Sequence, residues 1–439
     1  MSDKKKSLIE KIIHHAKTGT LVATSFRFIS NQIRQFIDLC IFFKRSFRRI
    51  VHLTVNIYLF IINYLNNVSI TIHRVLLFTY SNFLYLTSHY LYICSAIIAI
   101  VLVTHDLLFF RRKNSKSMPH VNVADSSVEV IIVNWNGASL LRQCLPSVVA
   151  AAVKSQTPTS VTIVDNGSDD DSIEWTMTNW PSVRIISLPV NYGFGEGNNI
   201  AVSKSNADII ILLNNDMLVD KNFIDPLIQA LKAPGTFAAA SQIMMRSEVR
   251  RAETGLTTGT FSVGRFNVMH ASITPLIDLD DVVPVFWAGG GAMAVHRRSF
   301  NMLGGFQKLY APFYWEDADL SYRAWTLGLR SVMVPQSRVL HLHRSTTSRF
   351  SETLVKRIVR RNEYLFTWSN VNNWKWMSEH LLMLPIHVVR DAKEVGIIVA
   401  FGSLLMALLR LPAALELRRK TKINRHLSDQ EIMVQFFKQ

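Results

Sequence analysis

Cysteine is scarce in this 439-residue sequence, which contains only Cys40, Cys94 and Cys144. An odd number of cysteines, without the close spacing of a metal site, argues against a disulfide framework and favours a reducing compartment. A cleavable signal peptide is not expected either, because the basic start at residues 1–6 is not followed by a compact apolar stretch with a small-residue cleavage site. These absences argue against a secreted, disulfide-stabilised protein.

Acidic residues are also few: the sequence has 32 Asp and Glu but 48 Lys and Arg. Its formal net charge is therefore +16. Such a charge calls for a negatively charged partner, either nucleic acid or an anionic membrane surface. Nucleic-acid-binding proteins carry a basic stripe on a folded domain, whereas here the basic residues flank apolar runs. With a hydrophobic fraction of 49%, this pattern favours the membrane and argues against nucleic acid as a partner.

The N-terminal part has two stretches without any Asp, Glu, Lys or Arg, residues 50–73 and 75–105. A spanning helix needs about 20 apolar residues, so the second stretch is long enough. The first is marginal, because it contains asparagines that are costly in hydrocarbon. Basic clusters outside both stretches predict a hairpin with both ends in the cytoplasm, holding the rest of the chain at the cytoplasmic membrane. The alternative is a set of amphipathic helices in the membrane interface.

The pattern changes after a polar linker at residues 111–126. Short runs rich in Val, Ile and Leu then alternate with helical-length segments; these runs are Val128–Val133, Ser160–Val164, Val183–Leu188 and Asp208–Leu213. Continuous apolar strands alternating with helices predict an α/β fold with a mostly parallel sheet, buried on both faces. Ligands of such sheets bind at the carboxyl ends of the strands, where the polar motifs of this chain fall.

The expected organisation has five parts. A basic arm (1–49) precedes membrane-associated helices (50–110), the linker (111–126) and the α/β domain (127–347). The remaining part, 348–439, reads as helical and basic. Its apolar run, 395–409, is too short to span a membrane. An interfacial helix pair and an ordinary buried helix are both consistent with it.

Polar residues follow the first two predicted strands. Asn134 and Asn136 come after the first, and Asp165 and Gly167 after the second. A carboxylate at Asp165 is suited to accept the imide N–H of a pyrimidine, and short residues let the backbone approach a nucleotide. Turn residues after strands are routine, so each motif alone is also compatible with a plain loop.

A glycine-rich segment, residues 191–199, follows the third strand and includes Gly193 and Asn199. Its glycines partly mimic a dinucleotide-binding fingerprint, but their spacing is different. We expect the next helix to begin near Asn198, so that its amides face a phosphate. A plain strand–helix connection is the competing interpretation.

The fourth strand runs directly into Asn214-Asn215-Asp216. A carboxylate at the end of a buried strand lies where a divalent cation can bridge it to a diphosphate, and Mg²⁺ and Mn²⁺ favour this mixture of oxygen ligands. We expect Asn215 to contribute to the nucleotide site. An Asn/Asp turn that merely ends the strand explains the motif equally well when it is taken alone.

Two further segments indicate a sugar site with a catalytic base. The first is apolar and glycine-rich and contains Trp287, Gly289 and Gly290, whose backbone could pass close beneath a sugar. The second has three carboxylates at an expected helix start, next to Trp315; they are Glu316, Asp317 and Asp319. Acidic residues also favour helix N-termini, so one or two of them could serve only as caps.

A histidine pair, His341 and His343, ends a further strand-like run. Strand alternation places both side chains on one face, where either could complete a metal shell. An exposed pair of histidines would carry little meaning alone, but this pair follows several other strand-end motifs.

The ordered set of motifs resembles the inverting, GT-A-fold glycosyltransferase family 2, especially its rhamnosyltransferase-like and galactofuranosyltransferase-like branches. The matching segments are Ile132–Gly137, Val164–Asp170, Asn191–Asn199, Leu213–Asp216, Ala288–Ala292, Trp315–Leu320 and His341. The resemblance covers residues 127–347 and implies a nucleotide-sugar donor and a divalent cation, Mg²⁺ or Mn²⁺. It does not extend to the first 126 residues.

The resemblance also implies roles for individual residues. Asp165 would bind the nucleobase, Asp216 and His341 the metal, and Asp317 would be the general base, with Glu316 and Asp319 orienting it or binding acceptor hydroxyls. The family's Asp-x-Asp element has Asn214 in its first position here, which leaves Asp216 as the metal-binding carboxylate of that turn. His343 is the fallback for His341.

The expected function is inverting transfer of a sugar, for example rhamnose, from a UDP or dTDP donor to a saccharide or lipid-linked acceptor in cell-surface polysaccharide assembly. One alternative is a processive polysaccharide synthase, but the Gln-x-x-Arg-Trp element of those enzymes is missing. Another is an inactive membrane scaffold with the same fold. The scaffold would have no need for Asp165, Asp216, Asp317 and His341 together.

Overall fold

The computed structural model describes residues 56, 70–108, 127–245, 254–271, 281–342 and 350–437. The chain divides into two compact units, Met1–Ile93 and Cys94–Gln439. In the first unit the described residues are Asn56 and the beginning of helix α3 (Ile70–Leu108). Most of the first apolar stretch, the linker and His343 lie outside the described residues.

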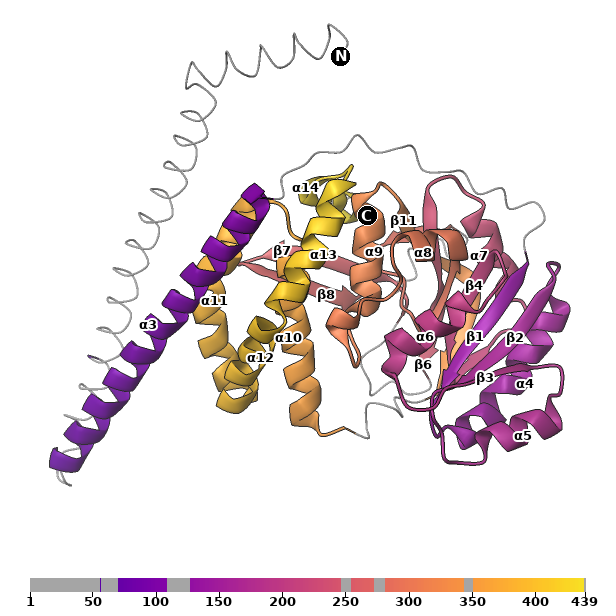
Figure 1. The fold of residues 1–439 in the computed structure, drawn as a ribbon, viewed down its shortest axis with the longest axis horizontal. Coiled ribbons are helices and arrows are strands. Elements are labelled where there is room, and N and C mark those ends of the chain that lie inside the picture. Colours follow the sequence, from indigo (N-terminus) through magenta and orange to yellow (C-terminus); the bar gives the residue numbers. More distant parts are fainter. Residues whose placement is uncertain are drawn as a thin grey trace, which may run out of the picture. The chain divides into compact units, whose positions relative to one another are not determined.

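Four parallel strands form one half of the main sheet, in the order β3-β2-β1-β4 (Figure 1). They are β1 (Val128–Asn134), β2 (Thr159–Asp165), β3 (Arg184–Ser187) and β4 (Ile209–Asn214). The sequence prediction of these strands is confirmed. Asn134 and Asp165 are partners in the register of β1 and β2, so the polar residues after these strands meet at one edge of the sheet.

The other half of the sheet is mixed, which corrects the expectation of a mostly parallel sheet. Its strands are β5 (Met217–Val219), β6 (Thr236–Met245), β9 (Val283–Val285), β10 (Ala292–His296) and β11 (Arg330–His341). Strand β10 runs antiparallel to both β4 and β6, while β11 is parallel to β6 and antiparallel to β5 and β9. The reversal follows the turn at residues 289–291, which brings the chain back alongside the end of β4.

Helices cover both faces of the sheet. On one face α4 (Ala138–Lys154) and α7 (Ile224–Leu231) pack on side chains such as Val130 and Ile132. On the other, α6 (Gly193–Ser203), α8 (Arg297–Met302) and α9 (Glu316–Thr326) pack on Ile131. Because alternate residues of a strand point to opposite faces, the continuous apolar strands satisfy both layers. Helix α5 (Ser172–Asn179) lies between β2 and β3 in the chain.

A β-hairpin and the C-terminal helices form a second layer of structure. The hairpin is β7 (Thr257–Ser262) and β8 (Arg265–His270), and the helices are α10 (Glu352–Asn370), α11 (Trp374–Val395), α12 (Ile397–Leu409), α13 (Leu411–Ile423) and α14 (Asp429–Phe437). Buried Arg265 of the hairpin forms ion pairs with Asp391 of α11 and Glu363 of α10. These charged contacts fix the hairpin to the helices.

The last part of α3 belongs to this same unit. Asp106, 5% exposed, accepts two hydrogen bonds from the Arg418 guanidinium of α13, at 2.9 and 2.7 Å. Lys422 lies 3.0 Å from the same carboxylate, and Ser95 donates to the Leu381 carbonyl of α11. The part of α3 from Cys94 onward is thereby anchored to the C-terminal helices through a buried ion pair.

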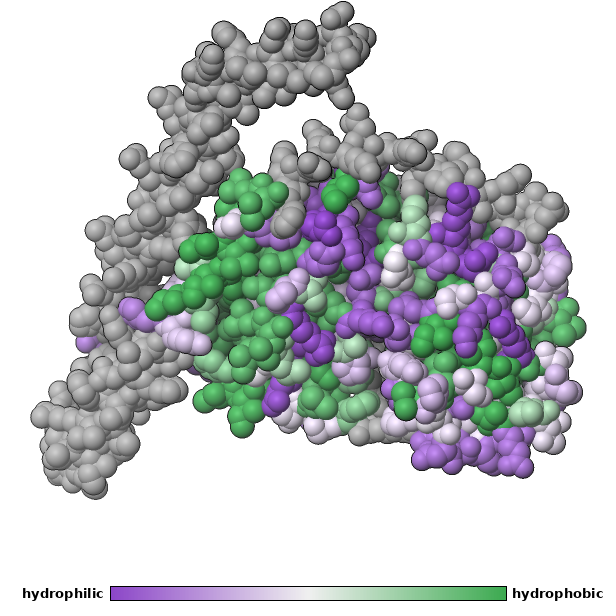
Figure 2. Space-filling model, in the orientation of Figure 1, coloured by the Kyte–Doolittle hydropathy of each residue, from purple (hydrophilic) through white to green (hydrophobic). Residues whose placement is uncertain are grey.

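Among the described residues, one helical segment, His89–Leu108, is long and apolar enough to cross a membrane. Helices α12 and α13 would add a second only if they count as one span, and they are bent by 59° at their junction. Helix α12 exposes large apolar side chains, including Ile397, Ile398, Leu405 and Leu409. Figure 2 shows hydrophobic residues gathered over α11 and α12, in contrast to the more polar surface of the sheet region.

Candidate active site

The residues after β1 and β2 form a hydrogen-bonded network. The buried Asn134 side chain donates to Ser172 Oγ (3.0 Å) and accepts from Asn215 Nδ2 (2.8 Å). Asn136 has a positive φ of 49°, and its Oδ1 accepts from the Asp169 amide at 2.8 Å. Asn134 and Asn215 therefore hold the strand ends of β1 and β4 together, and their side-chain amides are used inside the protein.

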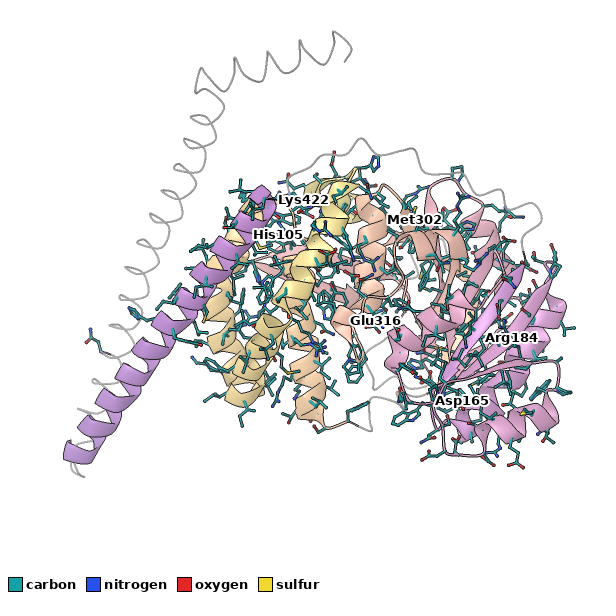
Figure 3. All side chains as sticks on the ribbon, viewed as in Figure 1. His105, Asp165, Arg184, Met302, Glu316 and Lys422 are labelled. Atoms are coloured by element: carbon teal, nitrogen blue, oxygen red, sulfur yellow. The ribbon has the colours of Figure 1, made fainter. Side chains whose placement is uncertain are left out.

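Asp165 stands beside this network at the end of β2 (Figure 3). Its Oδ1 accepts the Ser168 amide at 2.9 Å, which shapes the turn that follows. Gly167 in that turn has φ +74°, and a Cβ there would lie 2.7 Å from the Val190 carbonyl carbon. The turn thus needs glycine both for its backbone conformation and for its close approach to the next segment.

The glycine-rich segment corrects the expected helix start, because α6 begins at Gly193 rather than near Asn198. The Asn191 side chain accepts from the Gly193 amide at 2.8 Å, and Gly193 has φ +79°. Within the helix, a Cβ on Gly195 would come 3.2 Å from Phe306 Cβ. These glycines allow α6 to pack closely against the chain that precedes α9.

The half-buried side chain of Asn199 binds the backbone of Phe306. Its amide donates to the Phe306 carbonyl (2.8 Å) and accepts from the Phe306 amide (2.9 Å). Both polar groups of the side chain are therefore engaged by one backbone position. Asn199 thus positions the segment around Phe306, and its contact with a nucleotide stays a prediction.

The two residues expected to bind metal lie together, although 125 positions separate them in the chain. His341 Nε2 is 3.0 Å from Asp216 Oδ2, and both side chains are buried. The pairing of β5 with β11 places them there, with the Leu342 amide donating to the Asp216 carbonyl at 2.9 Å. Asp216 Oδ1 is buried and has no hydrogen-bond partner.

An unpaired, buried carboxylate oxygen beside a histidine fits a divalent cation. Among the described residues, no group of three or more His, Cys, Asp or Glu side chains is arranged to hold a metal. Asp216 and His341 would thus supply two ligands, and the others would come from water and from the phosphates of a donor. Such shared coordination is usual for Mg²⁺ at phosphate sites.

The expected base stands at the start of α9. Asp317 Oδ2 accepts the Gly290 amide at 3.2 Å. The carbonyl of the next residue, Gly291, accepts the Asn214 amide at 2.9 Å. One short loop, residues 289–291, therefore contacts both the candidate base and the turn that carries Asp216. This geometry brings the predicted metal and base segments into one site.

The backbone before α9 is strained. The backbone φ values of Tyr314 and Trp315 are 69° and 74°, which residues other than glycine rarely adopt. Asn362 of α10 holds this segment by donating to the carbonyls of Tyr310, Phe313 and Tyr314. Asn362 could not be predicted from the sequence, because a polar residue in a helix carries no mark of its distant partners.

Glu316 begins α9 (Figure 3). It is 8% exposed, and its Oε2 is buried without a hydrogen-bond partner. Burial and the neighbouring Asp317 raise the pKa of Glu316 to about 8. This shift favours the protonated form of Glu316, which can donate a hydrogen bond.

Glu316 also lines a pocket of about 190 Å³. Its other lining residues come from the start of α6 and from the chain before α9; they are Tyr192, Gly195, Glu196, Phe306, Gln307, Lys308, Ala311 and Pro312. An aromatic and apolar wall with a few polar groups is the usual composition of a small-molecule pocket. One lining residue, Glu316, directly precedes the candidate base Asp317 in the chain.

Three residues expected to contact a sugar are packed in the interior. Asp319 is fully buried and bonds Tyr310, Asn370 and Arg323, so its carboxylate stabilises the fold and is not presented to a sugar. Trp315 packs on Phe366 with ring centroids 5.0 Å apart, and Trp287 packs on His270 at 5.3 Å. Gly289, by contrast, has open space where a side chain would extend.

Comparison with known proteins identifies the class. Residues 129–289 match the model of the family described as Glycosyl transferase family 2, so this part of the chain is similar to that family. The N-acetylglucosaminyl-diphospho-decaprenol L-rhamnosyltransferase of Mycobacterium tuberculosis is 24% identical over 289 residues, which cover 59% of this chain and 92% of that protein.

More distant similarity supports the same fold. Human polypeptide N-acetylgalactosaminyltransferase 10 is 24% identical over 246 residues, 53% of this chain and 40% of that enzyme. The structure of GalNAc-T7 with UDP, GalNAc and Mn²⁺ superposes with a TM-score of 0.50 at 17% identity, covering 72% of this chain and 57% of that one. The chain thus has a GT-A-like α/β fold with a mixed sheet, and this part of the sequence resemblance is confirmed.

Proposed function

We propose that this glycosyltransferase is an inverting, metal-dependent enzyme that uses a UDP- or dTDP-sugar, such as dTDP-rhamnose, and a lipid-linked saccharide acceptor in cell-surface polysaccharide assembly. The observation that carries the proposal is the loop at residues 289–291, which contacts both Asp317 and the Asn214–Asp216 turn. The mycobacterial relative supports the rhamnosyl donor and the lipid-linked acceptor, since its name states both.

The proposed chemistry assigns one step to each group. Asp317 accepts a proton from an acceptor hydroxyl, whose oxygen attacks the anomeric carbon while the bond from that carbon to the diphosphate breaks. A single displacement inverts the anomeric centre. A cation bound by Asp216 and His341 would neutralise charge on the departing diphosphate. Glu316, protonated at neutral pH, donates a hydrogen bond to a sugar oxygen in the pocket.

We further propose that the protein works at the cytoplasmic membrane with its catalytic domain in the cytoplasm. The apolar segment His89–Leu108 and the exposed side chains of α12 support a lipid partner. The excess of Lys and Arg is favourable at an anionic membrane surface. A nucleotide sugar made in the cytoplasm would reach the site directly in this orientation.

Two alternatives remain outcomes of the same experiment. A processive synthase would yield products longer than one added sugar, and an inactive scaffold would yield none. The test is transfer from UDP- and dTDP-sugars with Mn²⁺ to a lipid-linked disaccharide, by full-length protein in detergent, with product length read by mass spectrometry. We expect addition of one sugar from one of these donors.

Replacing Asp317 with Asn should lower the transfer rate by roughly 10²- to 10⁴-fold, the usual contribution of a general base. Asp220→Asn is a matched control, because Asp220 is exposed and lies after β5, away from α9. Undiminished transfer by Asp317→Asn would show that Asp317 is not the base.

A further inference from the structure

Arg361 and Arg410 lie beside the chain that precedes α9, and Arg357 lies near Arg361 on α10. Arg361 Nη2 donates to the Ala311 carbonyl at 2.6 Å, and Arg410 Nη1 donates to the same oxygen at 3.1 Å. Arg357 lies one turn before Arg361 on the same face of α10. Its Nε approaches Gly402 of α12 so closely that a Cβ there would be 3.1 Å away. The arginine cluster is thus formed by α10 and the end of α12.

This cluster has no counter-charge among the residues that the structure describes. Other buried arginines of the same unit have a carboxylate partner; Arg265 pairs with Asp391, Arg323 with Asp319, Arg418 with Asp106 and Arg425 with Asp429. Within the described ranges, the guanidinium groups of Arg361 and Arg410 donate only to backbone carbonyls and to the side chain of Asn362.

The arginine cluster also contains an N–H donor that makes no hydrogen bond within the described structure. Arg357 Nε is buried and lacks a hydrogen-bond partner in the described structure. Burial and the nearby Arg410 lower the pKa of Arg361 to about 10, as expected where like charges meet without an acid. Clustered guanidinium groups with free N–H donors are suited to phosphate oxygens, which they bind in pairs of hydrogen bonds.

The cluster also occupies a boundary between two surfaces. On one side it contacts Ala311, which lines the pocket containing Glu316. On the other, Arg410 directly follows Leu409, which is 74% exposed, at the end of the apolar α12. A molecule that consists of an apolar chain, a phosphate group and a sugar, in that order, would contact α12, the arginine cluster and the pocket.

We propose that Arg357, Arg361 and Arg410 bind the diphosphate of a lipid-linked acceptor, with its lipid chain along α12 and its sugar in the pocket at Glu316. This assignment names the acceptor class and rests on the proposed function. The phosphates supply the missing negative charge, and the apolar face of α12 supplies the contact for the lipid. The donor diphosphate belongs to the separate site at Asp216.

Binding of farnesyl diphosphate to the full-length protein in detergent micelles tests the assignment without requiring turnover. Calorimetric titration should show binding of farnesyl diphosphate and much weaker binding of farnesol. Arg357→Gln and Arg410→Gln should each weaken farnesyl diphosphate about tenfold or more, by loss of charge-assisted hydrogen bonds. Neither should change the Mn²⁺-dependent affinity for UDP or dTDP. Arg361 is less suitable, because its buried hydrogen bonds also support the fold.

Arg390→Gln is the matched control, since Arg390 is exposed on α11 and pairs with Glu394; it should leave binding unchanged. Unchanged affinity in both cluster variants, with melting temperatures like wild type, would overturn the proposal. So would arginine-dependent binding to phosphatidylglycerol vesicles without binding of farnesyl diphosphate, which would indicate a bulk phospholipid site. If farnesyl diphosphate binds as expected but no sugar is transferred, the proposed function fails and the diphosphate site stands.

Discussion

Glu316 and Asp317 are adjacent carboxylic acids with different surroundings, and burial raises the pKa of Glu316. The folded-state pKa of Glu316, about 8, lies above its ordinary value of 4.5. The folded protein therefore retains this proton between pH 4.5 and 8, while the unfolded chain releases it. By linkage, the stabilising contribution is complete below about pH 4.5 and is lost as the pH rises toward 8.

Glu316→Gln removes this titration, because glutamine is neutral at every pH. The melting temperature of the variant relative to wild type should therefore rise between pH 5 and pH 8, measured by thermal unfolding in a series of buffers. Glu174→Gln, at an exposed position of α5, should show no such trend. A difference between Glu316→Gln and wild type that does not vary with pH would contradict the high pKa.

Asp216 permits a direct test of the metal site. Asp216→Asn should weaken UDP or dTDP binding in the presence of Mn²⁺ by tenfold or more and should abolish the effect of the metal on affinity, because the amide cannot supply a charged ligand. Titration calorimetry with and without Mn²⁺ measures both. A metal chelator should reproduce the loss in wild type. Equal Mn²⁺ dependence in the variant and in wild type would show that Asp216 does not bind the cation.

Two glycines at the site should respond differently to replacement by alanine. A Cβ on Gly137 would lie 2.3 Å from Asn134 Oδ1 and from Asn215 Nδ2, between two atoms that hydrogen-bond each other. Gly137→Ala should lower the melting temperature and weaken nucleotide binding. Gly289→Ala has open space and should leave the melting temperature unchanged. Lower transfer activity in Gly289→Ala would then indicate that the acceptor or donor sugar passes over this residue.

The residue types in the sequence predicted where the site side chains lie better than they predicted what these side chains bind. Asp216, His341 and Asp317 stand where strand ends and a helix start placed them in the sequence. Asn199 and Asp319 were assigned to ligands but bind Phe306, Tyr310, Asn370 and Arg323 inside the protein. Amide and carboxylate side chains bind other protein groups and ligands equally well, so only the folded structure shows which of the two a given side chain binds.

At the scale of elements, the four parallel strands were readable because each is a short continuous run of Val, Ile and Leu. Strand β6 lacked that signal, since Ala238, Ala239 and Ala240 occupy its centre. Its pairing with β10 depends on contacts such as Ala240 with Met293, more than fifty positions away. Strand order on that side of the sheet is therefore a long-range property that local periodicity does not contain.

The buried ion pair between Arg265 and Asp391 should be important for the hairpin β7–β8. Asp391→Asn leaves the positive charge of Arg265 less compensated, and breaking a buried pair costs about 3 to 5 kcal/mol in the free energy of unfolding. Denaturant unfolding in detergent measures the loss. Glu394→Gln, which disrupts only the exposed pair with Arg390, should cost less than about 1 kcal/mol. Similar values for the two variants would contradict this role.

At the scale of the whole molecule, the structure divides between Ile93 and Cys94, inside α3, and the end of the second apolar stretch belongs to the unit with the α/β domain. Sequence hydropathy marks the apolar run but does not show this division. The division is consistent with the Asp106–Arg418 contact, which ties the last turns of α3 to α13. The membrane hairpin expected within residues 50–110, its orientation in the membrane and the linker at 111–126 stay predictions.

The proposed membrane contact of α12 can be tested with an environment-sensitive dye at introduced cysteines, after Cys40 and Cys94 are replaced by Ser; the remaining Cys144 is buried. A dye at Leu405→Cys, 59% exposed on α12, should shift to the blue when the protein enters phosphatidylglycerol vesicles. A dye at Val153→Cys, 82% exposed on α4, should not. Equal spectra at the two positions would show that α12 does not touch lipid.

The ion pair between Asp106 and Arg418 also has a consequence in time. These partners are 312 positions apart, and ribosomes add roughly 5 to 20 residues per second. Asp106 is therefore synthesised roughly 15 to 60 s before Arg418, at the end of a helix that is already apolar enough for lipid. During that interval its carboxylate must stay hydrated or protonated, so the end of α3 reaches its final environment only when synthesis of the chain is almost complete.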